Sequence, residues 1–520
     1  MDAFIKVHQD GVIGTLQTFD RMIFKGHLTG FFPRGAFALF LHRQGVLLKD
    51  FSDYVQACTR ELKEHAQRLA HDADRPFIYL QSASTRRQGE SKEDLARAIA
   101  ERDGIRDGLV CVFSVLEPCS SFAVQGNRET QRLEVVRRQR KCLHFYFYVL
   151  DPEFGLTHVR LQSWFPFTIQ VYVNGRAWLR RELDRRGIGC EQYENAFTWI
   201  EDLSTASALC ERFARRRWPG ILNAWARRVN PLLSTIRGAG FGEYYWVLDQ
   251  AEYASDVMFR DRHTLERLYP ELVQAAMTEL SSADVLRFLG RKLHGNFRGQ
   301  VTSDLKRRPE GRRVKHRMKQ NSLKMYDKCS VLRIETTINN PREFKVLRVL
   351  STRFGRSRRW CPMGKGVANL WRYAQVGGQA NHRYLDALAH VRPKGEAVAE
   401  LDRLCRPAVT RGKRYARFNP ITREDVNLFK AVLDGDHALR GFRNADIQRH
   451  LYTTPAANRR ERQVRSAQIS RKIAKLRGHG LVRKVPRSRV YHVTPRGYNI
   501  LSAAVRYRER DFPIAMRAAA

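Results

Sequence analysis

The chain has 520 residues, 43% hydrophobic and 10% aromatic, which is long and apolar enough for several domains with their own cores. Its 93 Lys and Arg against 53 Asp and Glu give a net charge of +40, which favours a polyanionic partner, nucleic acid before an anionic membrane surface. The longest apolar runs are about eight residues, too short for a spanning helix of about twenty, and the first residues lack the pattern of a signal peptide.

We therefore expect a cytoplasmic protein without membrane contact. Its nine cysteines are odd in number and show no C-x-x-C or Cys/His zinc spacing, which predicts reduced thiols and no metal site.

Residues 1–175 are predicted to form an α/β domain. "RPFIYL" (75–80) is typical of a strand, "SKEDLARAIAERDG" (91–104) of a helix capped by Ser91, and "GLVCVFSVL" (108–116) of a buried strand. Strand, helix and strand in this order predict a parallel crossover. Two further strands follow, at 140–151 and 157–175. Residues 176–290, where Trp and Leu recur at helical spacing, are predicted to be mostly helical.

Residues 291–410 are predicted to form a basic antiparallel sheet region with following helices. From Arg291 to Lys319 there are eleven Lys and Arg against two Asp and Glu. Turns at "RPEG" and "QN" and a period-two alternation of charged and apolar residues predict a meander of about four strands from Gln300 to Ile338.

One face of this meander is predicted to be apolar, with Leu323, Met325, Leu332, Ile334 and Ile338. The other would carry cations and a tyrosine, which suits contacts with a nucleic-acid backbone. A turn at Lys328–Cys329 would place Lys324 opposite Arg333, a like-charge pair that a phosphate would relieve. The residues predicted to contact nucleic acid here are Arg313, Lys315, Arg317, Lys324, Lys328 and Arg333. A solvated basic surface is the other interpretation.

The segment "NSLKMYDKCSVLRIETTIN" (321–339) loosely resembles plasmid and phage replication initiators, in which a tyrosine attacks DNA and a carboxylate helps to hold a metal. The resemblance implies Tyr326 as the nucleophile. Glu335, with Asp304 or Asp327, would bind Mg²⁺ or Mn²⁺. No His-x-His pair is present to complete such a metal site.

The last predicted domain is residues 411–520, and the stretch 401–520 carries 28 Lys and Arg against 9 Asp and Glu. Helices are expected at 422–436, 443–452 and 460–480. On the third, Val464, Ala467, Ile469, Ile473 and Leu476 would form the inward stripe. The alternating "LVRKVPRSRVYHVT" (481–494) predicts a two-stranded wing, and Pro495 begins a last helix.

This order, with "KLRGHGLVRKVPRSRVYHVTPRGYNIL", resembles the winged helix-turn-helix of bacterial transcription regulators. The resemblance implies that the third helix enters a DNA major groove and that the wing meets the backbone or minor groove. The candidate contacts are Arg465, Gln468, Arg471, Lys472 and Lys475 on the helix and Arg487 and Arg489 on the wing. A winged helix that binds protein or RNA is the alternative.

The sequence as a whole predicts an α+β multidomain protein that binds nucleic acid, with DNA favoured over RNA. It resembles uncharacterised bacterial proteins of mobile elements. A DNA-nicking or strand-transfer enzyme, active in replication initiation or transposition, and an RNA-binding protein remain as alternatives.

Overall fold

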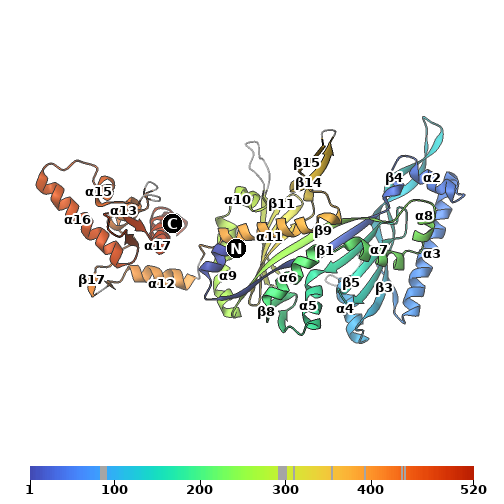
Figure 1. The fold of residues 1–520 in the computed structure, drawn as a ribbon, viewed down its shortest axis with the longest axis horizontal. Coiled ribbons are helices and arrows are strands. Elements are labelled where there is room, and N and C mark those ends of the chain that lie inside the picture. Colours follow the sequence, from blue (N-terminus) through green and yellow to red (C-terminus); the bar gives the residue numbers. More distant parts are fainter. Residues whose placement is uncertain are drawn as a thin grey trace. The chain divides into compact units, whose positions relative to one another are not determined.

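The chain divides into two units, residues 1–389 and 390–520. The structure is a computed structural model that describes the whole chain except residues 82–90, 291–300, 309–310, 353–354, 392–393, 411, 435–436, 438–440 and 520. One large mixed sheet with many helices makes up the first unit, while helices and short hairpins make up the second (Figure 1). The predicted α+β, multidomain fold class is confirmed. Nowhere in the described residues is a helix both long and apolar enough to cross a membrane.

Eleven strands form the sheet of the first unit, in the spatial order β10-β11-β12-β13-β9-β1-β6-β5-β4-β3-β2. Its strands are β1 (Val12–His27), β2 (Phe77–Leu80), β3 (Gly108–Asn127), β4 (Arg132–Asp151), β5 (Gly155–Gln162), β6 (Ile169–Asn174), β9 (Tyr245–Phe259), β10 (Val301–Arg308), β11 (Gly311–Met318), β12 (Asn321–Lys328) and β13 (Val331–Ile338). The predicted four-strand meander is thus confirmed as β10 to β13. The predicted parallel pair is confirmed as β2 and β3, joined by α4 (Lys92–Arg102), whose first turn is capped by Ser91.

The strand β9 was not predicted, and it changes the domain organisation. It lies between β13 and β1, so that the regions 1–175 and 291–338 share one sheet. It lies within the region 176–290, which was expected to be mostly helical. That region also contains the hairpin of β7 (Cys190–Tyr193) and β8 (Ala196–Ile200).

Helices cover one face of this sheet. α3 (Phe51–Asp72) packs on β3, α6 (Leu203–Ala214) on β1, α7 (Trp218–Val229) on β5, and α11 (Leu370–Ala387) on β9 and β13 (Figure 1). The other helices of the unit are α1 (Asp2–Val7), α2 (Ala36–Arg43), α5 (Gly175–Arg185), α8 (Leu233–Gly238), α9 (Arg262–Thr278) and α10 (Ser282–Phe288). The opposite face carries the charged side chains of β9 to β13 and, farther along, packs against α4.

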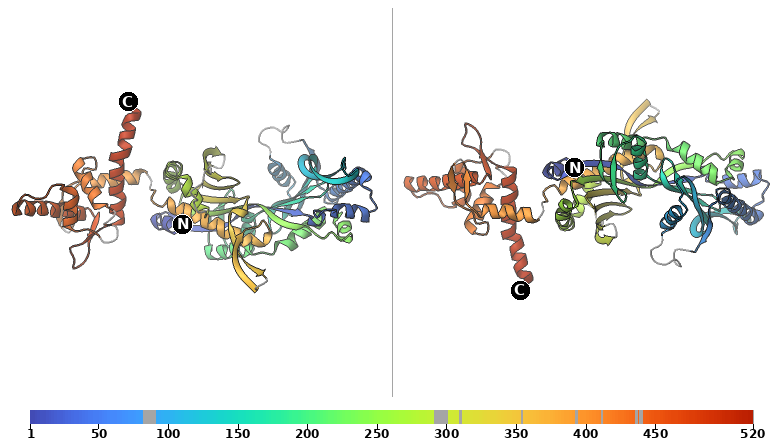
Figure 2. Two further views of the ribbon diagram at one scale, coloured as in Figure 1. Left: turned by 90° about the horizontal axis from the view of Figure 1, so that it is seen from above. Right: turned by 90° about the horizontal axis from the view of Figure 1, so that it is seen from below.

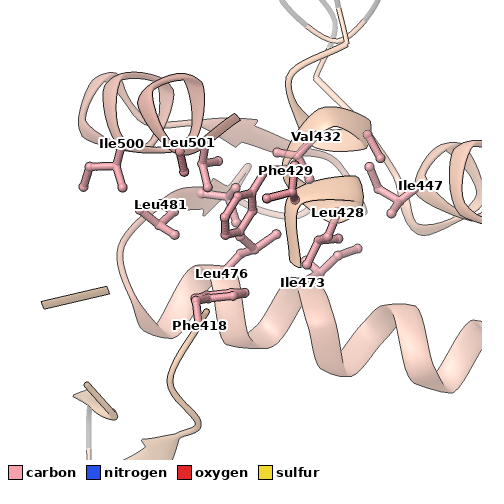
Figure 3. Packing of buried hydrophobic residues seen from close by; sticks show 14 of the residues in the cluster. Phe418, Leu428, Phe429, Val432, Ile447, Ile473, Leu476, Leu481, Ile500 and Leu501 are labelled. Atoms are coloured by element: carbon pink, nitrogen blue, oxygen red, sulfur yellow. The ribbon is translucent and has the colours of Figure 1, made fainter. Parts of the chain in front are cut away.

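The second unit has the element order predicted from the sequence. After α12 (Lys394–Leu404) and the short hairpin of β16 (Ala408–Thr410) and β17 (Lys413–Tyr415) come the main elements. These are α13 (Arg423–Val432), α15 (Asn444–Leu451), α16 (Arg459–Gly478), the hairpin of β18 (Val482–Lys484) and β19 (Tyr491–Val493), and α17 (Pro495–Arg506), with α18 (Phe512–Ala519) at the end. Figure 3 shows their shared core, in which Phe429, Ile473, Leu476 and Leu501 pack together.

Candidate nucleic-acid interface

The first half of α16 extends beyond the core of the second unit. Ile469, Ile473 and Leu476 are buried as predicted, but Val464 is 48% exposed and Ala467 is exposed too. The burial of α16 therefore begins only at Ile469. The residues of the first half are held as a helix by the cap from Asn458, whose side chain accepts from the Glu461 backbone N–H at 2.8 Å.

Three arginines stand exposed at the beginning of this helix, Arg459, Arg460 and Arg462. The N-terminus of a helix carries a partial positive charge, so cations there are unfavourable by some tenths of a kcal/mol each. Glu461 is the acidic residue of the first turn. These arginines, which the sequence analysis did not select, create a positive helix end that a phosphate would stabilise.

The candidate residues predicted on α16 fall into two groups. Arg471 and Gln468 are exposed, and the Gln468 side chain accepts from the Tyr452 hydroxyl at 2.6 Å. Arg465, Lys472 and Lys475 are engaged within the unit. Arg465 donates to Glu461 and to the Thr454 carbonyl, Lys472 pairs with Glu424 at 2.6 Å, and Lys475 lies 3.5 Å from Asp425. Partly exposed pairs of this kind contribute about 0–1 kcal/mol, so they can exchange for a phosphate.

The turn between β18 and β19 presents the two predicted wing arginines. Arg487 and Arg489 are exposed, and Arg487 takes a left-handed φ of 54° at the tip. Arg483 and Lys484 on the preceding strand are exposed as well. The hairpin thus adds four accessible cations to those of α16.

The register of β12 and β13 differs from the prediction. β12 continues to Lys328, and Cys329, with φ 55°, turns the chain together with Ser330. Lys324 therefore stands opposite Glu335 rather than Arg333. The expected repulsion is replaced by an ion pair of 2.5 Å, and Glu252 of β9 approaches the same ammonium group at 3.0 Å.

Arg333 belongs to a buried ionic network. Its side chain is 1% exposed and binds both oxygens of Asp256 at 2.8 and 3.1 Å and Asp20 at 3.0 Å. Arg176 joins them through a 2.6 Å contact with Asp256. Although burial acts to raise the pKa of Asp256, Arg176 and Arg333 hold it below its usual value, so this carboxylate is charged.

Three of the six predicted sheet contacts are consequently unavailable. Lys324 and Arg333 are buried in the pairs just described, and Lys328 is buried against Glu194 at 2.7 Å. The charges of these three side chains are neutralised by carboxylates within the chain. Arg317 is exposed, while Arg313 and Lys315 are half-buried and Arg313 lies 3.7 Å from Asp304.

The proposed catalytic residues are not brought together around a metal site. Asp304 is on β10 and Glu335 on β13, with β11 and β12 between them, and Asp304 lies near Lys306 and Arg313. The Asp327 side chain lies on the opposite face of the sheet from Tyr326, and it accepts a hydrogen bond from the Arg312 backbone N–H. Burial and, after it, the negative charge of Glu335 raise the pKa of Tyr326, although the charge of Lys324 acts in the opposite direction. A raised pKa disfavours the phenolate that a tyrosine nucleophile requires. This geometry therefore does not favour a nicking reaction.

The pair of carboxylates that share Lys324 should make stability depend on pH. Burial, then repulsion from Glu335, raises the pKa of Glu252 from 4.5 to about 7. The pKa of Glu252 is higher in the folded protein than in the unfolded chain. Its contribution to stability is therefore fully present below pH 4.5 and is lost as the pH rises to about 7. We expect Glu252→Gln to remove this loss, measured by urea unfolding across that range. The exposed control Glu211→Gln should follow the wild-type protein, and parallel curves for all three would contradict the assignment.

A two-stranded ribbon forms a further basic surface, which the sequence patterns did not predict. β14 (Lys345–Thr352) and β15 (Gly355–Pro362) pair only with each other and project from the first unit (Figure 2). Arg348 stands opposite Arg359, a like-charge pair that destabilises a ribbon in the absence of an anion. Trp360 is 56% exposed on the other face of the ribbon, where the Arg372 guanidinium lies 5.3 Å from its ring centroid. Arginines on both sides of Gly355 are the signal that could have predicted this ribbon.

The chain was also compared with known proteins. No family model, no curated protein and no solved structure matches it.

Proposed function

We propose that this protein binds duplex DNA, with the second unit acting as a winged helix and the ribbon β14–β15 as an additional contact. The observation that carries the proposal is the exposed first half of α16, with Arg459, Arg460 and Arg462 at its start and Gln468 and Arg471 farther along. A protruding helix of this kind fits a major groove, and arginine and glutamine suit base edges and phosphates.

Charge supports the same conclusion. Residues 401–520 hold 28 of the 93 Lys and Arg, and nine of those that are exposed lie on α16 and on the hairpin β18–β19. Cations at a helix N-terminus and arginines opposite one another on a ribbon both weaken an isolated protein. The phosphates of a nucleic acid would relieve either repulsion.

The ribbon supplies a second type of contact. A two-stranded β-ribbon fits a DNA groove as a helix does, and its exposed Trp360 can pack on sugars or bases. The two units are joined by one chain, so two weak contacts would reinforce each other.

The test is the salt dependence of binding by the full-length protein to a labelled duplex, measured by fluorescence anisotropy. Six phosphate contacts, from Arg459, Arg460, Arg462, Arg471, Arg487 and Arg489, predict a slope of log K against log salt of about −5. A slope near zero, or no binding at low salt, would refute the proposal. Single-stranded RNA in the same assay addresses the alternative, because stronger binding to it than to the duplex would favour an RNA-binding protein.

A further inference from the structure

Three potential metal ligands meet on strands β3 and β4 of the first unit. Cys119 lies on β3, and Cys142 and His144 lie on β4. In the register of the two strands Glu117 faces Cys142 and Val115 faces His144. Because alternate residues of a strand share a face, Cys119, Cys142 and His144 all point to the same side of the sheet.

The three side chains are also close in space. One ligand atom from each lies within 4.8 Å of the others, and no other such group of His, Cys, Asp or Glu is found among the described residues. The sulfur atoms of Cys119 and Cys142 are 2.7 Å apart. All three residues are buried, with exposures of 8%, 5% and 1%.

His144 is held in the form that binds metals. Its Nδ1 lies 3.1 Å from the Cys142 carbonyl oxygen, which can only accept, so Nδ1 carries the proton and Nε2 carries the lone pair. A backbone carbonyl that orients a histidine in this way is typical of metal sites.

Cationic side chains lie near the two cysteines. Arg140 stands opposite Cys119 in the register of the two strands, and Arg160 lines the same cavity as Cys119. Arg160 is itself fixed by an ion pair of 2.8 Å with Glu117. Thiolates, rather than thiols, are the ligands of soft and borderline metal ions.

From this arrangement we infer a Zn²⁺ site formed by Cys119, Cys142 and His144, with the fourth ligand position open to a cavity. Two thiolates and one imidazole are a preferred ligand set of Zn²⁺, and three protein ligands leave one position for water or another small ligand. Zn–S bonds of about 2.3 Å in a tetrahedron hold two sulfurs about 3.8 Å apart, so the two cysteines separate by about 1 Å on binding.

The cavity beside the site has a volume of about 540 Å³. His144 and Cys119 line it together with Lys25, Arg137 and Arg160. Positive side chains around an open metal position favour an anionic fourth ligand, such as phosphate, over a neutral one.

The experiment is a metal titration of the full-length protein, purified under reducing conditions. We expect one Zn²⁺ per chain in elemental analysis. Replacement by Co²⁺ should give the thiolate-to-cobalt charge-transfer absorption and the intense visible bands of a tetrahedral site. Cys119→Ser and Cys142→Ser should each abolish the charge-transfer band or lower the Co²⁺ affinity at least tenfold, and His144→Gln should weaken binding and shift the visible bands.

The matched control is Cys111→Ser, a buried cysteine of the same strand outside the cluster. It should bind metal like the wild-type protein, and circular dichroism of each variant identifies any loss of fold. Metal bound equally well by Cys119→Ser and by the wild-type protein would overturn the inference. So would the absence of bound metal together with two fewer free thiols than the chain's nine cysteines, since the pair would then be a disulfide.

Discussion

Replacing Arg333 with methionine is expected to lower the free energy of unfolding by about 3–5 kcal/mol. The substitution keeps much of the side-chain volume but leaves Asp256, which is fully buried, with Arg176 alone, and leaves Asp20 without its 3.0 Å partner. An uncompensated buried carboxylate is far more costly than the loss of an exposed ion pair. Urea unfolding followed by circular dichroism measures the effect.

The control is Arg317→Met on β11, which removes an exposed arginine from the same face of the sheet. Its cost should stay within about 0.5 kcal/mol. A loss below about 1 kcal/mol for Arg333→Met would contradict the view that this network holds β13, β9 and β1 together. The double variant Arg333→Met with Asp256→Asn should lose less free energy of unfolding than the sum of the two single variants. The reason is that Asp256→Asn removes the negative charge that Arg333→Met leaves without its partner.

The second large effect is expected on DNA binding. Changing Arg459, Arg460 and Arg462 together to glutamine removes three exposed cations from the start of α16. At about 0.9 counterions released per contact, the salt slope should become shallower by about 2.7, and affinity at about 0.1 M salt should fall about a hundredfold. Anisotropy titrations with one labelled duplex at several salt concentrations give both values.

A variant of equal charge change separates this local effect from net charge. Arg60, Lys63 and Arg68 are exposed on α3, so changing all three to glutamine also removes three cations. We expect the α3 variant to bind DNA almost as the wild-type protein does. Equal losses in the two triple variants would mean that α16 has no special role in binding.

Local patterns predicted much of the fold. The alternation in "RRVKHRM" (312–318) and the turns beside it were enough for the meander β10–β13. The cap at Ser91 fixed the beginning of α4, where its side chain accepts from the Asp94 backbone N–H at 3.0 Å. The order of helices and hairpin in the second unit was also predictable, because the apolar spacing marks the helices, and the "PRSR" turn and Pro495 mark the hairpin and the last helix.

The environment of the charged residues could not be predicted in the same way. Arg333 and Lys324 look like solvent-exposed residues of a period-two strand, yet their partners Asp20 and Glu252 come from strands distant in the sequence. The register depended on a single residue, Cys329, whose left-handed backbone moved the turn by one position. The cluster of Cys119, Cys142 and His144 was hidden for a related reason, since its ligands come from two paired strands rather than from one short motif.

The central position of β9 has a consequence for how this protein is made. During synthesis β1 to β6 leave the ribosome long before β9, whose pairing with β1 spans more than 200 residues. Until then the β1 side of the nascent sheet is an open edge, able to pair with other chains. Contacts so distant in sequence also form slowly. The first unit is therefore expected to depend on chaperones during translation, and fragments that end before residue 245 should aggregate.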